Sequence, residues 1–162
     1  MRRAIAVIAG VLILAAANWT IYARERLLAE GQVVLLELAP VDPRSLMQGD
    51  YMALRFALAD ELQNKARVSR DGRVVVRLDE RGVGRYARTD DGSALGEREM
   101  ALRYRLRDGR VKFASNAFFF QEGTAVQYSG ARYGEARVAP SGELLITGLR
   151  DAKLEPLGAP RR

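Results

Sequence analysis

The chain has 162 residues, which fits one domain plus an appendage, and 48% of them are hydrophobic, enough to build a core. It contains neither histidine nor cysteine, which excludes Ser-His-Asp and Cys-His catalysis, imidazole or thiolate metal sites, and disulfides. The formal net charge is +6, but the 26 cations are interleaved with acids along the chain. Because nucleic-acid binders cluster their cations on one face or segment, we expect no nucleic-acid partner.

The first segment is apolar and predicts a membrane anchor. Two arginines precede an uncharged stretch from Ala4 to Ala23, which as a helix is about 30 Å long and matches the hydrocarbon core of a bilayer. Trp19 and Tyr22 lie near its far end, where aromatic rings favour the interface. The alternative is a cleaved signal peptide with the alanines at 15–17 as its cleavage site. We favour a retained anchor, because the apolar run continues past these alanines into a further helical pattern.

The charges at the two ends of this segment predict its orientation. The two N-terminal arginines and the free amine outweigh Arg24 and Arg26, which Glu25 partly offsets, so the N-terminus is expected in the cytoplasm. We therefore divide the chain into residues 1–31, the transmembrane anchor and juxtamembrane helix, and residues 32–162, a domain outside the cytoplasm. In a bacterium this places the domain on the periplasmic side of the inner membrane.

The remaining chain predicts a β-rich domain. Apolar alternation and turn residues indicate strands at 32–38, 50–58, 72–78, 82–88, 98–106 and 110–115, and a terminal hairpin within 135–149. In the second of these strands, Met52, Leu54, Phe56 and Leu58 are expected to face one way. A helical turn is expected at 59–66, and a helix capped by Gly134 at 125–132. We predict an α+β fold: one transmembrane helix, then a single, mainly antiparallel β domain with one or two short helices.

The stretch VDPRSLMQGDYMALRF, residues 41–56, combines turn residues with the start of a strand. Asp42 before a proline is typical of a helix start, and Gly49 is typical of the residue that stops a helical turn. Asp50 then precedes the apolar face of the strand, where a carboxylate needs hydrogen-bonding or arginine partners. We therefore predict a one-turn helical connector that positions the strand.

The same stretch carries a resemblance to a known family. GDYMALRF resembles the signature of the bacterial GDYXXLXY family, a group of membrane-anchored proteins; Gly49, Asp50, Tyr51 and Leu54 match it. The preceding APVDPRSLMQ and the later FFFQEGTAVQYSGARYGEARVAPSGELLITGL are also similar to the family. The resemblance implies an anchored extracytoplasmic domain with no assigned reaction, and a polytopic membrane protein as its companion. Phe56 stands where the signature has tyrosine, so we predict that this position serves packing rather than proton chemistry.

The signature and the later similar block supply a candidate cluster of polar and aromatic residues. Its members are Asp42, Arg44, Gly49, Asp50, Tyr51, Leu54, Glu122, Tyr128, Arg132 and Tyr133. Tyr128 and Arg132 are four residues apart, which places them on one face of the expected helix. The cluster could converge as a polar groove. In the structural alternative, Asp42 caps a helix, Asp50 fixes a turn, and the tyrosines pack.

Other candidate sites are weaker. Ser45 with Lys65 would be a Ser-Lys pair only if the lysine were buried, and its surroundings are polar. The carboxylate pairs Asp79–Glu80 and Asp90–Asp91 could bind a hard cation, but adjacent residues of a strand face opposite ways, which favours solvated turns. The phenylalanines at 118–120 are expected in the core. We therefore expect no metal and no cofactor.

Together these observations favour a non-enzymatic, membrane-anchored domain that binds an integral membrane protein. The alternative is an extracytoplasmic ligand-binding or hydrolytic domain with a polar groove around Asp50, Tyr51 and Glu122.

Overall fold

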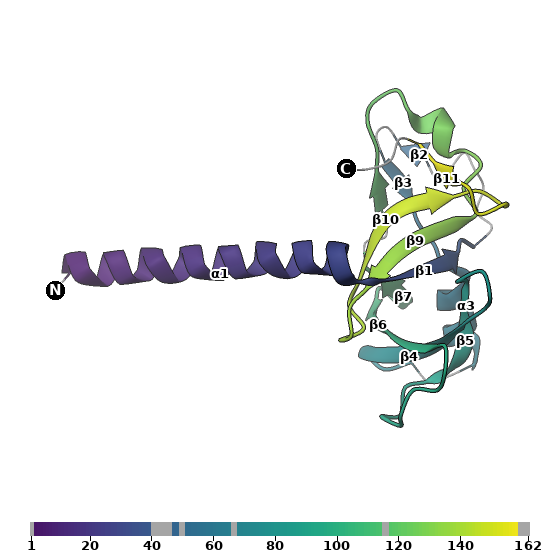
Figure 1. The fold of residues 1–162 in the computed structure, drawn as a ribbon, viewed down its shortest axis with the longest axis horizontal. Helices are drawn as coiled ribbons and strands as arrows, with labels where there is room; N and C mark the ends of the chain where they lie inside the picture. Colours follow the sequence, from purple (N-terminus) through teal and green to yellow (C-terminus); the bar gives the residue numbers. More distant parts are fainter. Residues whose placement is uncertain (1, 40–46, 49–50, 66–67, 115–116, 159–162) are drawn as a thin grey trace.

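The computed structural model describes residues 2–39, 47–48, 51–65, 68–114 and 117–158. Its elements form a long N-terminal helix and a β-rich body, and the helix projects from one side of that body (Figure 1). The expected α+β, β-rich fold class is confirmed.

The N-terminal helix α1 covers Arg2–Glu30. Within it, Val7–Glu30 has a mean hydropathy of 1.5, and every side chain of this span except that of Leu27 is exposed; of the described helices, it is the one long and apolar enough to cross a membrane. Two polar side chains inside the span bond to backbone carbonyls one turn earlier: Asn18 Nδ2 to Leu14 O at 2.9 Å and Thr20 Oγ1 to Ala16 O at 2.9 Å. These internal hydrogen bonds satisfy the polar side chains, which lowers the free-energy cost of placing them in the hydrocarbon core of a bilayer.

The helix ends where it was predicted to end. The backbone N–H of Gly31 donates to Leu27 O at 2.9 Å, and a Cβ at position 31 would overlap that carbonyl. The chain then enters the first strand directly (Figure 1).

The described strands form three antiparallel sheets. The first has the order β1-β9-β10-β11, the second β2-β3-β8 and the third β5-β4-β6-β7. Their bounds are β1 Gln32–Glu37, β2 Met47–Gln48, β3 Tyr51–Ala53, β4 Asp71–Leu78, β5 Gly84–Thr89, β6 Glu99–Arg107, β7 Arg110–Phe113, β8 Ala117–Phe119, β9 Tyr133–Val138, β10 Leu144–Arg150 and β11 Pro156–Leu157. The helix α3 covers Ala57–Lys65, and the 3₁₀ helix η1 covers Ala125–Tyr128.

The first and third sheets are joined at two points. A parallel bridge pairs Leu35 of β1 with Val83, and the Leu35 N–H donates to Gly82 O at 3.0 Å. The turn between β9 and β10 meets β6, where the Arg103 N–H donates to Gly142 O at 2.8 Å. These contacts curve the two sheets around a common interior.

The core lies between these sheets and α3. Val34 and Leu36 of β1 are fully buried, as are Val74 and Val76 of β4, because alternate strand residues face the same side. Leu62 of α3 is also fully buried and belongs to the same cluster. The strands expected at 32–38, 72–78, 82–88, 98–106 and 110–115 and the terminal hairpin are all observed, with boundaries moved by a few residues.

Three local predictions were wrong. The helix expected at 125–132 is a single 3₁₀ turn, and Gly134 lies inside β9 rather than at a helix end. Glycine is needed there because a Cβ would come within 2.9 Å of the Phe56 ring. Of the strand expected at 50–58, the structure forms only β3, and α3 begins at Ala57; the four residues expected on one face, Met52, Leu54, Phe56 and Leu58, are nevertheless buried. Finally, Met47–Gln48 are a strand rather than part of a helical turn; the remainder of that connector lies outside the described residues.

Candidate functional site

Four members of the predicted cluster, Asp42, Arg44, Gly49 and Asp50, lie outside the described residues, as does Ser45. Around them, β2 and β3 pair so that Gln48 lies opposite Tyr51.

The described signature residues mainly serve packing. Tyr51 in β3 lies beside Phe119 of β8, with ring centroids 5.7 Å apart. Leu54 is only 5% exposed and belongs to the core. Phe56 is 2% exposed and meets Phe113 edge-on at 6.4 Å, which fits the packing role predicted for this position.

Tyr128 also has a packing role. Its ring meets Phe118 edge-on at 5.4 Å and stacks on Phe120 at 5.1 Å. A Cβ at Gly158 would overlap the tyrosine hydroxyl, so the C-terminal segment lies directly against this ring. Phe118 is buried as expected, whereas Phe119 is 62% exposed, so the aromatic run at 118–120 is only partly core.

The structure does not gather the rest of the predicted cluster into a groove. Glu122 is exposed before η1, and Arg132 is exposed just before β9. Tyr133 is half-buried within β9, opposite Glu37. Because the expected helix is absent, Tyr128 and Arg132 do not share a helical face, and the spacing argument that joined them was wrong.

A different cavity lies where α1 meets the first sheet. This juxtamembrane groove has a volume of about 870 Å³. Its lining is formed by Glu25, Leu28 and Ala29 of α1, by Phe118, Tyr128, Glu135 and Arg137, and by residues 145–150 and 156–158. Among the cluster members that the structure describes, Tyr128 is the one that lines the groove.

The groove contains a half-buried ion pair. Arg150 donates from Nε to Glu135 Oε2 at 2.7 Å, and its Nη2 lies 2.6 Å from the same oxygen. The other carboxylate oxygen, Oε1, accepts from Thr147 Oγ1 at 3.3 Å. The β9-β10 register shifts between Ile146 and Gly148, and this bulge places Thr147 beside the pair. Arg150 Nη1 also donates to Leu154 O at 2.7 Å, so the pair is a polar element, held on several sides, in an otherwise largely apolar lining.

Two contacts hold the end of α1 against the first sheet. Arg24 Nη1 lies 2.9 Å from Glu143 Oε1 in the turn between β9 and β10. Arg137 Nη1 donates to Gly31 O at 3.1 Å, at the junction between α1 and β1. The groove therefore has a defined position directly beyond the apolar span.

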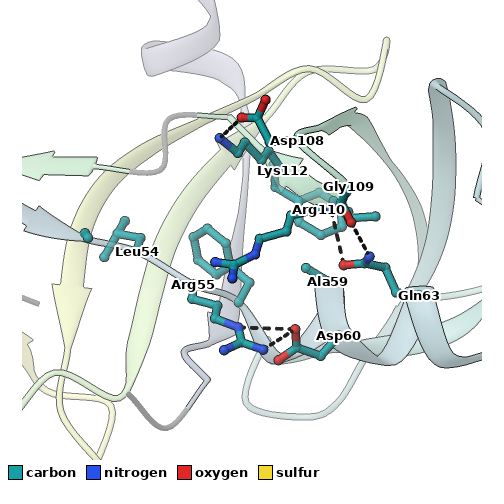
Figure 2. A pocket seen from close by; sticks show the side chains of 13 residues that line it. Leu54, Arg55, Ala59, Asp60, Gln63, Asp108, Gly109, Arg110 and Lys112 are labelled. Carbon is teal, nitrogen blue, oxygen red and sulfur yellow. Dashed lines mark hydrogen bonds and ion pairs between the residues drawn. The ribbon is translucent and has the colours of Figure 1, made fainter. Parts of the chain in front are cut away.

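A second pocket of about 830 Å³ lies between α3 and the β6-β7 hairpin (Figure 2). Gln63 joins the two elements, because its Nε2 donates to Gly109 O at 2.9 Å and its Oε1 accepts from the Val111 N–H at 3.3 Å. Arg55 forms a two-donor contact with Asp60 at 3.2 and 2.9 Å at the edge of the pocket. These bonds hold the pocket walls together, and neither this pocket nor the juxtamembrane groove is lined by Tyr51 or Glu122.

The carboxylates considered for cation binding serve their own turns. Asp79 Oδ1 accepts from the N–H groups of Val83 and Arg81 at 2.9 Å each, and the bond from Val83 is the main reason that the pKa of Asp79 is lowered. Asp90 accepts from the Gly92 N–H at 3.0 Å. Within the described ranges, no three acidic side chains come together as a metal site.

The Glu99 carboxylate accepts hydrogen bonds from Gly96, Arg77 and Arg88 in the third sheet. Hydrogen bonds from the Gly96 N–H, then from Arg77, hold its pKa below the ordinary value of 4.5, and Arg88 adds a further contribution. The bonds measure 3.1 Å from Gly96 N and 3.1 Å from Arg77 Nη2. This network fixes the start of β6 and lies away from both pockets.

Sequence reasoning missed the groove residues. Glu135 is the first residue of the predicted terminal hairpin and Arg150 directly follows its last, so a correct register would have placed them near each other. No local signal in the chain pointed to the contribution of α1, because the groove depends on how the helix sits against the sheet.

The fold and cavities define a β-rich domain carried by a helix able to span a membrane. Comparison with family models then identifies the family: the model described as "GDYXXLXY protein" matches residues 13–149. The chain belongs to this family. Neither the curated proteins nor the solved structures contain a match to it.

Proposed function

We propose that this protein is a membrane-anchored accessory protein whose β domain lies on the extracytoplasmic, periplasmic side of a bacterial inner membrane and binds an integral membrane protein. The observation that carries this proposal is the juxtamembrane groove. It begins at the last turns of α1, where Leu28 is 43% exposed, and continues over the first sheet.

The physical reason is continuity between two apolar surfaces. Apart from Leu27, the side chains of the α1 span are exposed, so they can contact lipid or a neighbouring transmembrane helix. A partner helix packed along α1 would leave the membrane beside the groove. An extramembrane segment of that partner could bury apolar side chains there and meet the polar Glu135–Arg150 pair.

Site-specific photo-crosslinking in native membranes tests this proposal. A benzophenone amino acid at Leu28 is expected to give a light-dependent adduct with a protein that has several membrane-spanning helices. The matched control is Leu95, which is 48% exposed in the loop before β6 and does not line the groove. Equal adducts from both positions, or adducts only with soluble proteins, would contradict the proposal.

A second variant separates the groove from the helix. Replacing residues 4–23 by an unrelated apolar span keeps the anchor but changes the surface of α1. Retention of the Leu28 adduct would assign recognition to the groove, whereas its loss would assign recognition to the transmembrane helix.

The proposed side of the membrane has its own test. The excess of positive charge before the span supports a cytoplasmic N-terminus. Alkaline phosphatase fused to the C-terminus is then expected to be active, and β-galactosidase fused there inactive. The opposite pattern would place the domain in the cytoplasm.

The alternative function, a ligand-binding or hydrolytic site around Asp50, Tyr51 and Glu122, stays a prediction. No described contact favours it, since Glu122 is exposed and Tyr51 packs beside Phe119.

A further inference from the structure

The outer face of β6 carries a row of arginines. Arg103, Arg105 and Arg107 are exposed, whereas Leu102 and Tyr104, which alternate with them, are buried and Leu106 is half-buried. Alternation along the strand places the three arginine side chains on one side of the sheet. The Cα atoms of successive arginines are about 7 Å apart along the strand. The core requires the buried residues of this strand, but it does not require arginine at the exposed ones.

This row lies beside the end of the membrane span. It borders a depression of about 490 Å³ whose charged lining is formed by Arg24, Arg103, Arg105, Arg107, Lys112 and Glu143. We call the five cations of this lining the basic patch. One carboxylate among five cations leaves a strongly positive surface.

Neighbouring strands increase the positive charge of this surface. In the observed register, three pairs of cations lie directly opposite each other: Arg73 and Arg103, Arg105 and Lys112, and Arg107 and Arg110. Like charges in this position destabilise a sheet. Acids offset part of this repulsion, because Arg73 pairs with Asp90 at 2.6 Å and Asp71 lies opposite Arg105. An anionic partner would relieve the repulsion that remains.

The acids of the domain neutralise only part of the patch. Arg24 pairs with Glu143, and the Arg105 and Lys112 nitrogens lie 3.8 and 3.7 Å from carboxylate oxygens of exposed aspartates. Exposed pairs at such distances are weak. Arg103 and Arg107 form no ion pair with any residue in the described ranges.

The position of the basic patch, next to the end of the uncharged stretch of α1, indicates which partner it can reach. Arg24 follows Ala23, the last residue of the uncharged stretch, and it lines the same depression as the β6 arginines. The interfacial layer on each side of a bilayer is about 5 to 8 Å thick, and the chain crosses it at this point. Figure 1 shows β6 and the β9-β10 turn on the side of the body from which α1 projects.

We propose that the basic patch binds the phosphate groups of anionic lipids in the leaflet where α1 leaves the membrane. Arginine donates paired N–H groups that match phosphate oxygens, and lipid phosphates lie at the depth of the patch. Binding would neutralise the repelling arginines and hold the third sheet against the membrane surface. This inference requires only that α1 spans the membrane, and it is independent of the protein partner proposed above.

The full chain in detergent, mixed with phosphatidylglycerol or phosphatidylcholine and observed by native mass spectrometry, tests this inference. The wild type is expected to retain phosphatidylglycerol preferentially. Each cation near an anionic surface contributes about 1 kcal/mol, or roughly fivefold in affinity, so R103Q/R107Q should weaken phosphatidylglycerol retention about 25-fold. R103K/R107K keeps the charge and should restore most of it.

The matched control is R81Q/R85Q. The side chains of these two arginines are 58% and 60% exposed. Arg85 lies in β5, the edge strand of the third sheet opposite β7, and Arg81 lies in the turn just before β5. This variant loses the same charge but should bind phosphatidylglycerol like the wild type. Circular dichroism of all variants verifies folding. The inference is overturned if the wild type retains both lipids equally, or if both glutamine variants lose the anionic lipid to the same extent.

Discussion

Truncation of Phe56 to alanine is the sharpest test of how the family signature stabilises this fold. The ring is 2% exposed, meets Phe113 edge-on and covers Gly134 of β9. Its backbone also bridges Leu38 beyond β1. Removing the ring leaves a cavity among β1, α3 and β9, and phenylalanine-to-alanine changes in cores cost about 3 to 5 kcal/mol.

That loss is large relative to the stability of a domain, which is about 5 to 15 kcal/mol. For a domain of this size, it corresponds to a decrease in melting temperature of about 10 to 20 °C. Thermal unfolding of the full chain in detergent, followed by far-ultraviolet circular dichroism, measures the change. The α1 signal should persist through the transition, because the helix does not depend on the core.

Phe119→Ala is the matched control, because it removes the same atoms from a ring that is 62% exposed. It should cost about 1 kcal/mol or less, mainly through the aromatic contact with Tyr51. Equal losses for the two variants would refute the view that Phe56 is a core residue and that this signature position serves packing.

Three further predictions concern the stability of the domain. Arg150→Met leaves the Glu135 carboxylate half-buried without its partner and should lower the free energy of unfolding by about 1 to 3 kcal/mol. This loss is smaller than for a fully buried pair, because both side chains are partly exposed. Urea unfolding measures it, and the double variant with Glu135→Gln should recover part of it. Glu99 has a lowered pKa, through its backbone hydrogen bond first and then its arginines, so its contribution is complete above the ordinary value of 4.5 and disappears as the pH falls through the lowered folded value. Glu99→Gln should therefore lose less stability than the wild type on acidification from about pH 6 to pH 3, and an unchanged acid limb in a melting-temperature series would contradict this. Gly142→Ala should destabilise the domain more than Gly92→Ala. Both glycines have positive φ (83° and 82°), but only at position 142 would a Cβ meet a β6 carbonyl oxygen, at 2.9 Å. Equal melting temperatures for the two variants would show that the β9-β10 turn does not need this close approach.

Local features of the sequence predicted most of the elements. The uncharged stretch from Ala4 to Ala23 predicted a spanning helix, and α1 ends at Glu30, next to the boundary predicted at residue 31. Alternation and turn residues predicted β4 and the β6-β7 hairpin, because a strand with one buried face has a period of two regardless of its partner. The same reasoning from local spacing was wrong at residues 125–132. A helical spacing of residues predicted an α-helix there, but the structure has a single 3₁₀ turn. There, packing of Tyr128 between two phenylalanines outweighs the spacing.

The candidate site could be predicted only in part for a similar reason. Tyr51, Leu54 and Tyr128 were selected from the family signature and its later block, and the structure gives them packing roles: Leu54 and Tyr128 belong to one core cluster, and Tyr51 packs beside Phe119. The Glu135–Arg150 pair lacked a signal of its own, because the bulge in β10 sets which side chains meet.

The sequence by itself determined which segments are apolar, where strands and turns occur, and that the charge is positive, since each depends on neighbours along the chain. Only the tertiary structure decided that β1 pairs with β9, about a hundred residues away, and that Gly134 must admit the ring of Phe56. It also brought Arg24 to the arginine row of β6 and formed a groove between α1 and the first sheet. These arrangements arise because distant strands pair so as to bury their apolar faces together, and that choice determines which polar side chains share the surface left outside.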